Sequence, residues 1–150
     1  MAEVIFYLLD EEQNDAQPAP LALACRLAAQ AYRSKQACLV LCEDKQQAEA
    51  VDELLWQLPV DAFVPHNLTG EGPPKGTPVE IAWQGSSRSN KPVLINLASQ
   101  LPEGHQRFKR IFDFVPADDQ QKQQARERYK QYRGAGHQLD TRPANSIEEN

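Results

Sequence analysis

The chain has 150 residues, 41% of them hydrophobic and 25% charged, and its formal net charge of -5 goes with a pI near 5.2. This length suits one globular domain with a real core, and the negative charge argues against a protein whose whole surface attracts nucleic acid. The N-terminal apolar run, Val4 to Leu9, is followed by acids and is too short for a signal peptide or a membrane span. We therefore expect a cytosolic protein without membrane contact.

The first predicted elements are a strand and a helix. Val4 to Leu9 is apolar, β-branched and aromatic, which is typical of a short strand buried on both faces. Pro20 suits the first position of a helix, because its missing N–H costs little there, and apolar residues then recur at helical spacing as far as Arg33. The side of this helix that faces the core is predicted to carry Leu21, Ala24, Cys25, Ala28 and Tyr32.

A second strand and helix repeat this order. Ala37 to Cys42 predicts another buried strand, and the helix after it starts with a capping-box pattern, Asp44 and Gln47, and stops at Pro59. Alternating strands and helices imply right-handed crossovers and a parallel sheet covered on both faces. The three cysteines lie in apolar segments without a CxxC pair, so we expect buried, unreactive thiols, no disulfide and no metal site.

Further strands and one long helix follow. Asp118 or Asp119 is predicted to cap a long polar helix that runs to Arg133. From Gly134 onward apolar periodicity is absent, which predicts a single domain over residues 1–139 and a polar, mobile tail over residues 140–150. The remaining predicted strands are Asp61–His66, Val79–Trp83, Pro92–Leu97 and Arg110–Val115.

The stretch FVPHNLTGEGPPKGTPVEIAW, residues 63–83, has the composition of a phosphate-binding loop. Such a loop needs inward-pointing backbone N–H groups and usually a helix after it. Pro73, Pro74 and Pro78 have no N–H, and a predicted strand follows instead of a helix. We therefore interpret the stretch as a stiff turn whose glycines supply positive φ angles.

An enzyme remains the alternative hypothesis. A nucleotide-binding or hydrolytic site would use the carboxyl ends of the strands near Asp10, Cys42 and His66, with Glu71 as another acid and Cys42 as the nucleophile. No pattern in the sequence ties an acid, a base and a nucleophile together, so we predict no catalytic residue and no cofactor.

Trp56 stands out on the second helix. At about 100° per residue, Trp56 points about 140° away from the middle of the helix's apolar stripe. Its indole therefore either packs under a neighbouring segment or is an exposed anchor for a partner. The stripe consists of Ala48, Val51, Leu54, Leu55 and Leu58.

A basic row marks the last predicted helix. Lys122, Arg126, Tyr129 and Arg133 are spaced i, i+4, i+7 and i+11, and Lys130 flanks them. The row is either a solvated face balanced by neighbouring acids or a site for an anion with an apolar part, such as an acidic peptide or a chain-terminal carboxylate. Single-stranded nucleic acid fits less well, because one tyrosine makes a poor stacking track.

Several stretches together closely resemble the chi subunit family of the bacterial DNA polymerase III holoenzyme. They are IFYLLD, LCEDKQQAEAVDELLW, FVPHNLTGEGPPKGTPVEIAW and DFVPADDQQKQQARERYKQYRGAGH. The resemblance implies a nucleotide-binding-like (Rossmann-like) α/β fold that binds no nucleotide, in a non-catalytic clamp-loader accessory subunit. It also implies two partners, the psi subunit and the acidic C-terminal tail of single-stranded DNA-binding protein, without strong direct binding of nucleic acid.

The resemblance also assigns residues to these partners. The tail pocket would be lined by Trp56, Lys122, Arg126, Tyr129 and Lys130. The surface for psi, for which a helicase competes in some bacteria, would consist of Phe63, Val64 and Pro65. We hypothesise that Arg126 or Lys130 holds the terminal carboxylate of the tail and that Lys122 attracts the acids before it.

Overall fold

The computed structural model describes residues 2–9, 19–58, 63–73, 76–84 and 91–146. The strands are β1 (Glu3–Leu8), β2 (Cys38–Cys42), β3 (His66–Leu68), β4 (Val79–Trp83), β5 (Val93–Asn96), β6 (Arg110–Val115) and β7 (Gln138–Pro143). The α-helices are α1 (Ala19–Arg33), α2 (Lys45–Leu55) and α3 (Asp119–Gly134). Two short 3-10 helices are η1 (His105–Arg107) and η2 (Ala144–Ser146).

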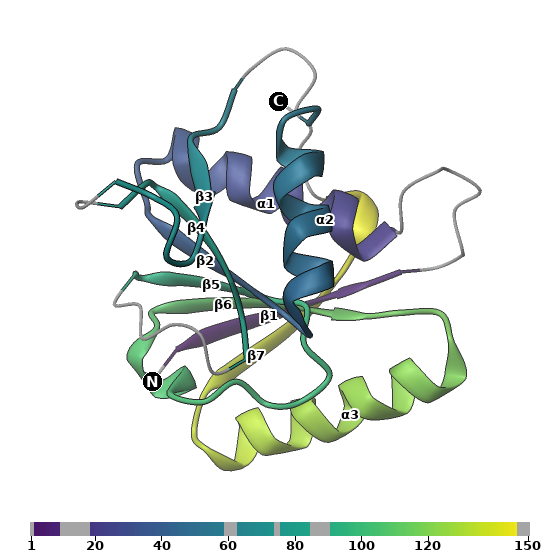
Figure 1. Ribbon diagram of the computed structural model, residues 1–150. Helices are drawn as coiled ribbons and strands as arrows, with labels where there is room; N and C mark the ends of the chain where they lie inside the picture. Colours follow the sequence, from purple (N-terminus) through teal and green to yellow (C-terminus); the bar gives the residue numbers. More distant parts are fainter. Residues whose placement is uncertain (1, 10–18, 59–62, 74–75, 85–90, 147–150) are drawn as a thin grey trace.

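The strands form one seven-stranded sheet in the order β3-β4-β2-β5-β6-β1-β7. Every strand pair is parallel. Helices α1 and α2 cover one face of the sheet and α3 covers the other (Figure 1). The predicted three-layer α/β fold with a Rossmann-like arrangement is confirmed, and the sheet is parallel throughout.

The two faces of the sheet have separate cores, because successive side chains of a strand point to opposite faces. In β1, Ile5 and Tyr7 belong to the core under α1 and α2, whereas Val4 and Phe6 belong to the core under α3. Strands buried on both faces read as continuous apolar runs, which is why β1, β2 and β5 were predictable from the sequence.

Some predicted boundaries are wrong. Helix α2 ends at Leu55, and Trp56 is its C-cap, so the helix does not reach Leu58. The third strand is His66–Leu68, which is later than the predicted Asp61–His66. Residues 61 and 62 lie outside the described residues. Tyr32 was predicted on the buried side of α1 but is 37% exposed, because it lies in the last turn of the helix.

Strand β7 was not predicted. Its residues 140–143 belong to the segment predicted to be a polar, mobile tail. The strand pairs with β1 at the edge of the sheet. Leu139 is its only large apolar residue, so no alternating pattern marks it. Its outer edge offers few free donors, because the Thr141 N–H donates to the Asp140 carboxylate and Pro143 has no N–H.

Candidate binding sites

A groove of about 310 Å³ lies between α3 and strands β1, β6 and β7. Its floor is apolar, and the Phe6 and Tyr129 rings meet there with centroids 5.3 Å apart. Two cationic side chains, Lys122 and Arg126, belong to the same lining. The full lining is Phe6, Leu8, Val115, Lys122, Ala125, Arg126, Tyr129 and Thr141. We call this site the α3 groove.

The orientation of α3 is fixed by its capped start and its buried face. The Asp118 carboxylate accepts the Gln121 N–H at the first turn, which confirms Asp118 as the cap. Arg128 and Tyr132 are buried and both bind Asp113 in the middle of β6. Because Ala125, Arg128 and Tyr132 share the inner side of the helix, the row of cations points outward.

The predicted basic row is only partly gathered at the groove. Lys122, Arg126 and Tyr129 line it. The Lys130 side chain is 73% exposed, and its Nζ lies 3.7 Å from a Glu127 carboxylate oxygen. Lys130 is thus a neighbour of the groove on the next helical ridge and not part of its wall.

Trp56 lies apart from the α3 groove. It follows α2 on the opposite face of the sheet, near the other end of the strand order, where α2 packs on β3 and β4. The prediction that Trp56 and the α3 cations line one pocket is therefore not met in this structure. The indole is 65% exposed and stacks on Phe63 with ring centroids 5.1 Å apart and an interplanar angle of 27°.

Phe63 and Trp56 form an exposed aromatic pair. Phe63 is 53% exposed, whereas Val64 is buried and Pro65 is half-buried, so only the first of the three predicted interface residues is exposed. The His66 ring packs edge-on to Trp56, 5.1 Å between centroids. Its two nitrogens lie 2.7 Å from the Val64 carbonyl and 3.2 Å from the Asp52 carbonyl, which ties the Phe63 segment to α2.

Comparison with known proteins now gives the family. The family model described as "DNA polymerase III chi subunit, HolC" matches residues 1–140. This protein belongs to the DNA polymerase III chi subunit family. It is 48% identical over 143 residues to the DNA polymerase III subunit chi of Escherichia coli, covering 94% of this chain and 97% of that protein.

Two further chi subunits are similar to this chi-family protein. That of Haemophilus influenzae is 48% identical over 120 residues, which cover 79% of this chain and 83% of the relative. That of Pseudomonas aeruginosa is 30% identical over 139 residues, which cover 93% and 94%. The resemblance inferred from sequence stretches is confirmed by the family match and by these relatives.

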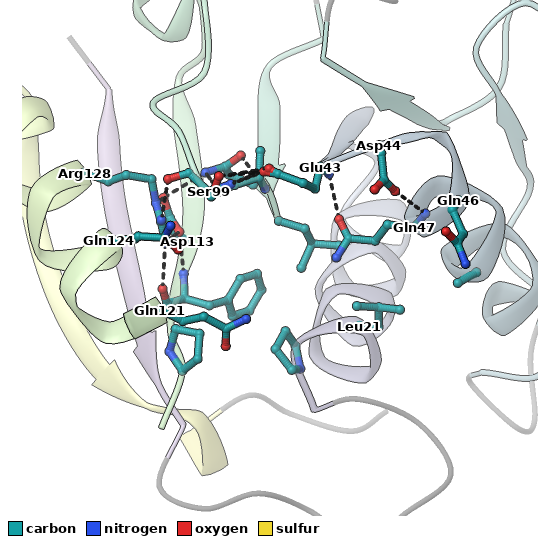
Figure 2. A pocket seen from close by; sticks show the side chains of 17 residues that line it. Leu21, Glu43, Asp44, Gln46, Gln47, Ser99, Asp113, Gln121, Gln124 and Arg128 are labelled. Carbon is teal, nitrogen blue, oxygen red and sulfur yellow. Dashed lines mark hydrogen bonds and ion pairs between the residues drawn. The ribbon is translucent and has the colours of Figure 1, made fainter. Parts of the chain in front are cut away.

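A crevice lies at the carboxyl ends of the strands, where nucleotides bind in many α/β folds. It has a volume of about 630 Å³ and opens between β2 and β5, and Figure 2 shows it from close by. From β2 the chain continues toward β3 at one end of the sheet, and from β5 it continues toward β6 on the other side. Glu43 and Asp44 after β2 line one wall, and Ala98 and Ser99 after β5 line another. Figure 2 shows that the residues labelled there come from all three helices and from the strand ends.

Carboxylates occupy this crevice where a phosphate would need donors. The Ser99 N–H and hydroxyl both donate to Glu43, at 3.0 and 2.6 Å. The Glu43 N–H in turn donates to the Gln47 side chain. Arg128, the cation in the lining, is already bound to Asp113 and to the Ser99 carbonyl. The crevice therefore presents carboxylates to an incoming anion, and its lining arginine is already paired.

The residues of the alternative enzyme hypothesis that the structure describes are not gathered at one place. Burial raises the pKa of the Cys42 thiol to about 12, so it is protonated at neutral pH. His66 lies on β3, two strands away from Cys42 on β2, and its ring nitrogens face the Val64 and Asp52 carbonyls. Asp10 lies outside the described residues, and Glu71 is exposed.

The described residues also provide no metal cluster and no membrane helix. Among them, no three His, Cys, Asp or Glu side chains are arranged to hold a metal ion. No helix in the same part of the chain is both long and apolar enough to cross a bilayer.

Two features of the sites were missed from the sequence. Phe6 and Leu8, at the end of β1, form part of the groove, and nothing local in an apolar strand marks which end is open. Asp113 was a readable signal, because a charged residue inside the apolar run RIFDFV requires a buried partner. That partner, Arg128, could not be identified from the sequence. It follows the stretch Gln120–Glu127, which has seven other polar or charged residues and is typical of a solvated helix.

Proposed function

We propose that this chi-family protein is a non-catalytic, clamp-loader-associated subunit of the replicative polymerase that binds the acidic C-terminal tail of single-stranded DNA-binding protein in the α3 groove. The observation that carries the proposal is the pairing of two cations, Lys122 and Arg126, with an apolar floor. A tail that ends in an apolar residue with a free carboxylate, preceded by acids, needs both.

The geometry supports a division of roles. Arg126 borders the apolar floor and is suited to a two-point contact with the terminal carboxylate. Lys122, one turn earlier on α3, is suited to the acids that precede it, and Tyr129 with Phe6 flanks the apolar side chain. Lys130 lies outside the groove lining and is paired with Glu127. It would contribute to tail binding by long-range attraction once its pair with Glu127 is broken.

A second surface on the opposite face of the sheet is proposed for the psi subunit, or for the helicase that competes with it in some bacteria. Trp56 joins Phe63 in this surface, because their rings stack on each other and both are exposed. The buried Val64 holds the segment in place. With its two partners on separate faces, the protein could link the polymerase to coated template in the cytoplasm without one partner displacing the other.

Titration with a peptide of the tail tests the first site. Arg126→Ala should weaken binding by about 2 kcal/mol, which is roughly 30-fold. Arg33→Ala removes the same charge from an exposed position in the last turn of α1 and should leave affinity unchanged. Equal affinities of wild type, Arg126→Ala and Lys122→Ala would refute the groove as the tail site.

Thermal shift separates this function from the alternative of a nucleotide-binding enzyme. A ligand that binds the folded state raises the melting temperature. The tail peptide should do so and ATP should not, since the crevice at the strand ends is lined by Glu43, Asp44 and Asp113. Stabilisation by ATP and not by the peptide would favour the enzyme.

A further inference from the structure

The exposed aromatic pair of Trp56 and Phe63 lies at the end of an acidic row. Glu53, Asp52 and Glu49 precede Trp56 by three, four and seven residues, the spacing that places side chains on one side of a helix. We call Glu49, Asp52, Glu53, Trp56 and Phe63 the α2 surface. Its charge is opposite to that of the α3 groove.

The carboxylates of this row differ in their availability. Asp52 is directed to His66, with 3.4 Å between its Oδ1 and the ring Nε2. Glu49 and Glu53 are exposed, and within the described part of the chain neither forms an ion pair. Two free negative charges thus lie within two helical turns of a large exposed apolar contact.

The aromatic rings also favour a positively charged ligand, as the carboxylates do. The face of an indole attracts cations through its quadrupole, and guanidinium groups stack on it readily. Trp56 is held by Phe63 on one side and His66 edge-on, so its orientation is fixed before a partner arrives. A fixed ring loses little entropy on binding, which favours it as an anchor.

We infer that the α2 surface takes a protein segment in which an apolar anchor side chain is flanked by arginine or lysine, spaced to meet Glu49 and Glu53. The inference rests on the proposed function, since it names the chemistry of the partner that docks at Trp56 and Phe63. The two faces of the protein then select partners of opposite charge, an acidic tail at α3 and a basic segment at α2. An acidic tail would be repelled by the carboxylates of the α2 surface, and a basic segment would be repelled by the cations of the α3 groove.

Binding of purified psi subunit at several salt concentrations tests the inference. Glu49→Gln/Glu53→Gln should weaken binding about five- to tenfold at low salt, chiefly by slowing association, and should flatten the salt dependence. The matched control is Glu103→Gln/Asp119→Asn. It removes the same charge at exposed positions outside the α2 surface, and Asp119 lies at the start of α3, on the opposite face of the sheet. This control should bind as wild type does.

Three outcomes would count against the inference or its basis. Unchanged affinity and salt dependence in Glu49→Gln/Glu53→Gln, with binding lost in Trp56→Ala, would overturn the charge preference and leave the docking site intact. Unchanged psi binding in Trp56→Ala/Phe63→Ala would instead refute the proposed site. Salt-sensitive dimerisation of the isolated chain, abolished by Glu49→Gln/Glu53→Gln in sedimentation experiments, would show that the occupant is a second copy of this chain.

Discussion

Arg128 and Asp113 form a two-point ion pair in the interior of the protein. Arg128 Nη2 lies 3.0 Å from Asp113 Oδ1, and Nε lies 3.1 Å from Oδ2. The second carboxylate oxygen also accepts the Tyr132 hydroxyl and the Asn96 amide. This one carboxylate therefore fastens the inner face of α3 to β6, and the outward direction of the α3 groove residues depends on it.

Loss of Arg128 should destabilise the fold. Arg128→Met leaves a buried carboxylate without its counter-charge, which costs about 3–5 kcal/mol when one partner of a buried pair is removed. Urea unfolding followed by circular dichroism measures the change. Arg110→Met is the control, because its pair with Glu3 is half exposed and should be worth less than about 1 kcal/mol. Equal losses in the two variants would contradict the anchoring role of Asp113.

Stability should fall on mild acidification because of two buried histidines. His137 Nε2 lies 2.7 Å from His105 Nδ1. The other ring nitrogen, His137 Nδ1, accepts the Ala2 N–H at 2.9 Å. Both rings are then neutral, with His137 donating through Nε2. A proton added to His137 Nδ1 or His105 Nδ1 would break one of these bonds.

The pKa of each ring is lowered, chiefly by burial and, for His105, also by repulsion from His137. A lowered pKa in the folded state means that the unfolded state binds protons first as pH falls. The contribution of the two neutral histidines to folding stability is complete above the unfolded pKa of about 6.5. It is lost as the pH drops toward the pKa values of the folded state. Urea midpoints at pH 7.5, 6 and 5 should decrease, and the decrease should shrink in His105→Gln/His137→Gln. The same pH dependence in that variant would rule the pair out as its source.

The three cysteines should be unreactive in the folded protein. Burial raises the pKa of Cys25, Cys38 and Cys42 to about 12 each, and all three are buried. At pH 8 about one thiol in ten thousand is ionised, and the thiolate is the reactive form. A thiol reagent should label no cysteine in the native protein within minutes and all three in denaturant. Fast native labelling of Cys42 would revive the nucleophile hypothesis.

The predictable part of the fold was the part that local pattern determines. Strands such as Cys38–Cys42 are continuous apolar runs, and the caps Asp44 and Asp118 were readable because their side chains act three residues away. Strand β7 escaped because an edge strand exposes most of its side chains and needs no apolar pattern. Its formation depends on pairing with β1, which lies more than 130 residues earlier.

The sites were predictable one residue at a time but not as groups. The periodicity of α3 placed Lys122, Arg126 and Tyr129 on one side, and all three line the α3 groove. Trp56 was correctly placed off the apolar stripe, yet helical geometry cannot say which segment returns beside it. The return of Phe63 to stack on Trp56 is a tertiary contact. Trp56 and the α3 groove lie on opposite faces of the sheet, which the periodicity of a single helix cannot show.

This separation makes the two proposed surfaces testable by a reciprocal exchange of variants. Trp56→Ala and Phe63→Ala remove exposed rings, so the melting temperature should change little, while psi binding should weaken by about 2 kcal/mol each. Neither substitution should change the affinity for the tail peptide. Tyr129→Ala should weaken binding of the tail peptide and leave binding of psi unchanged. Co-purification of psi and peptide titration, each applied to all three variants, give six results to compare with these expectations. A Trp56→Ala protein that loses the peptide would return Trp56 to the tail site, and wild-type recovery of psi with Phe63→Ala would remove Phe63 from the psi surface.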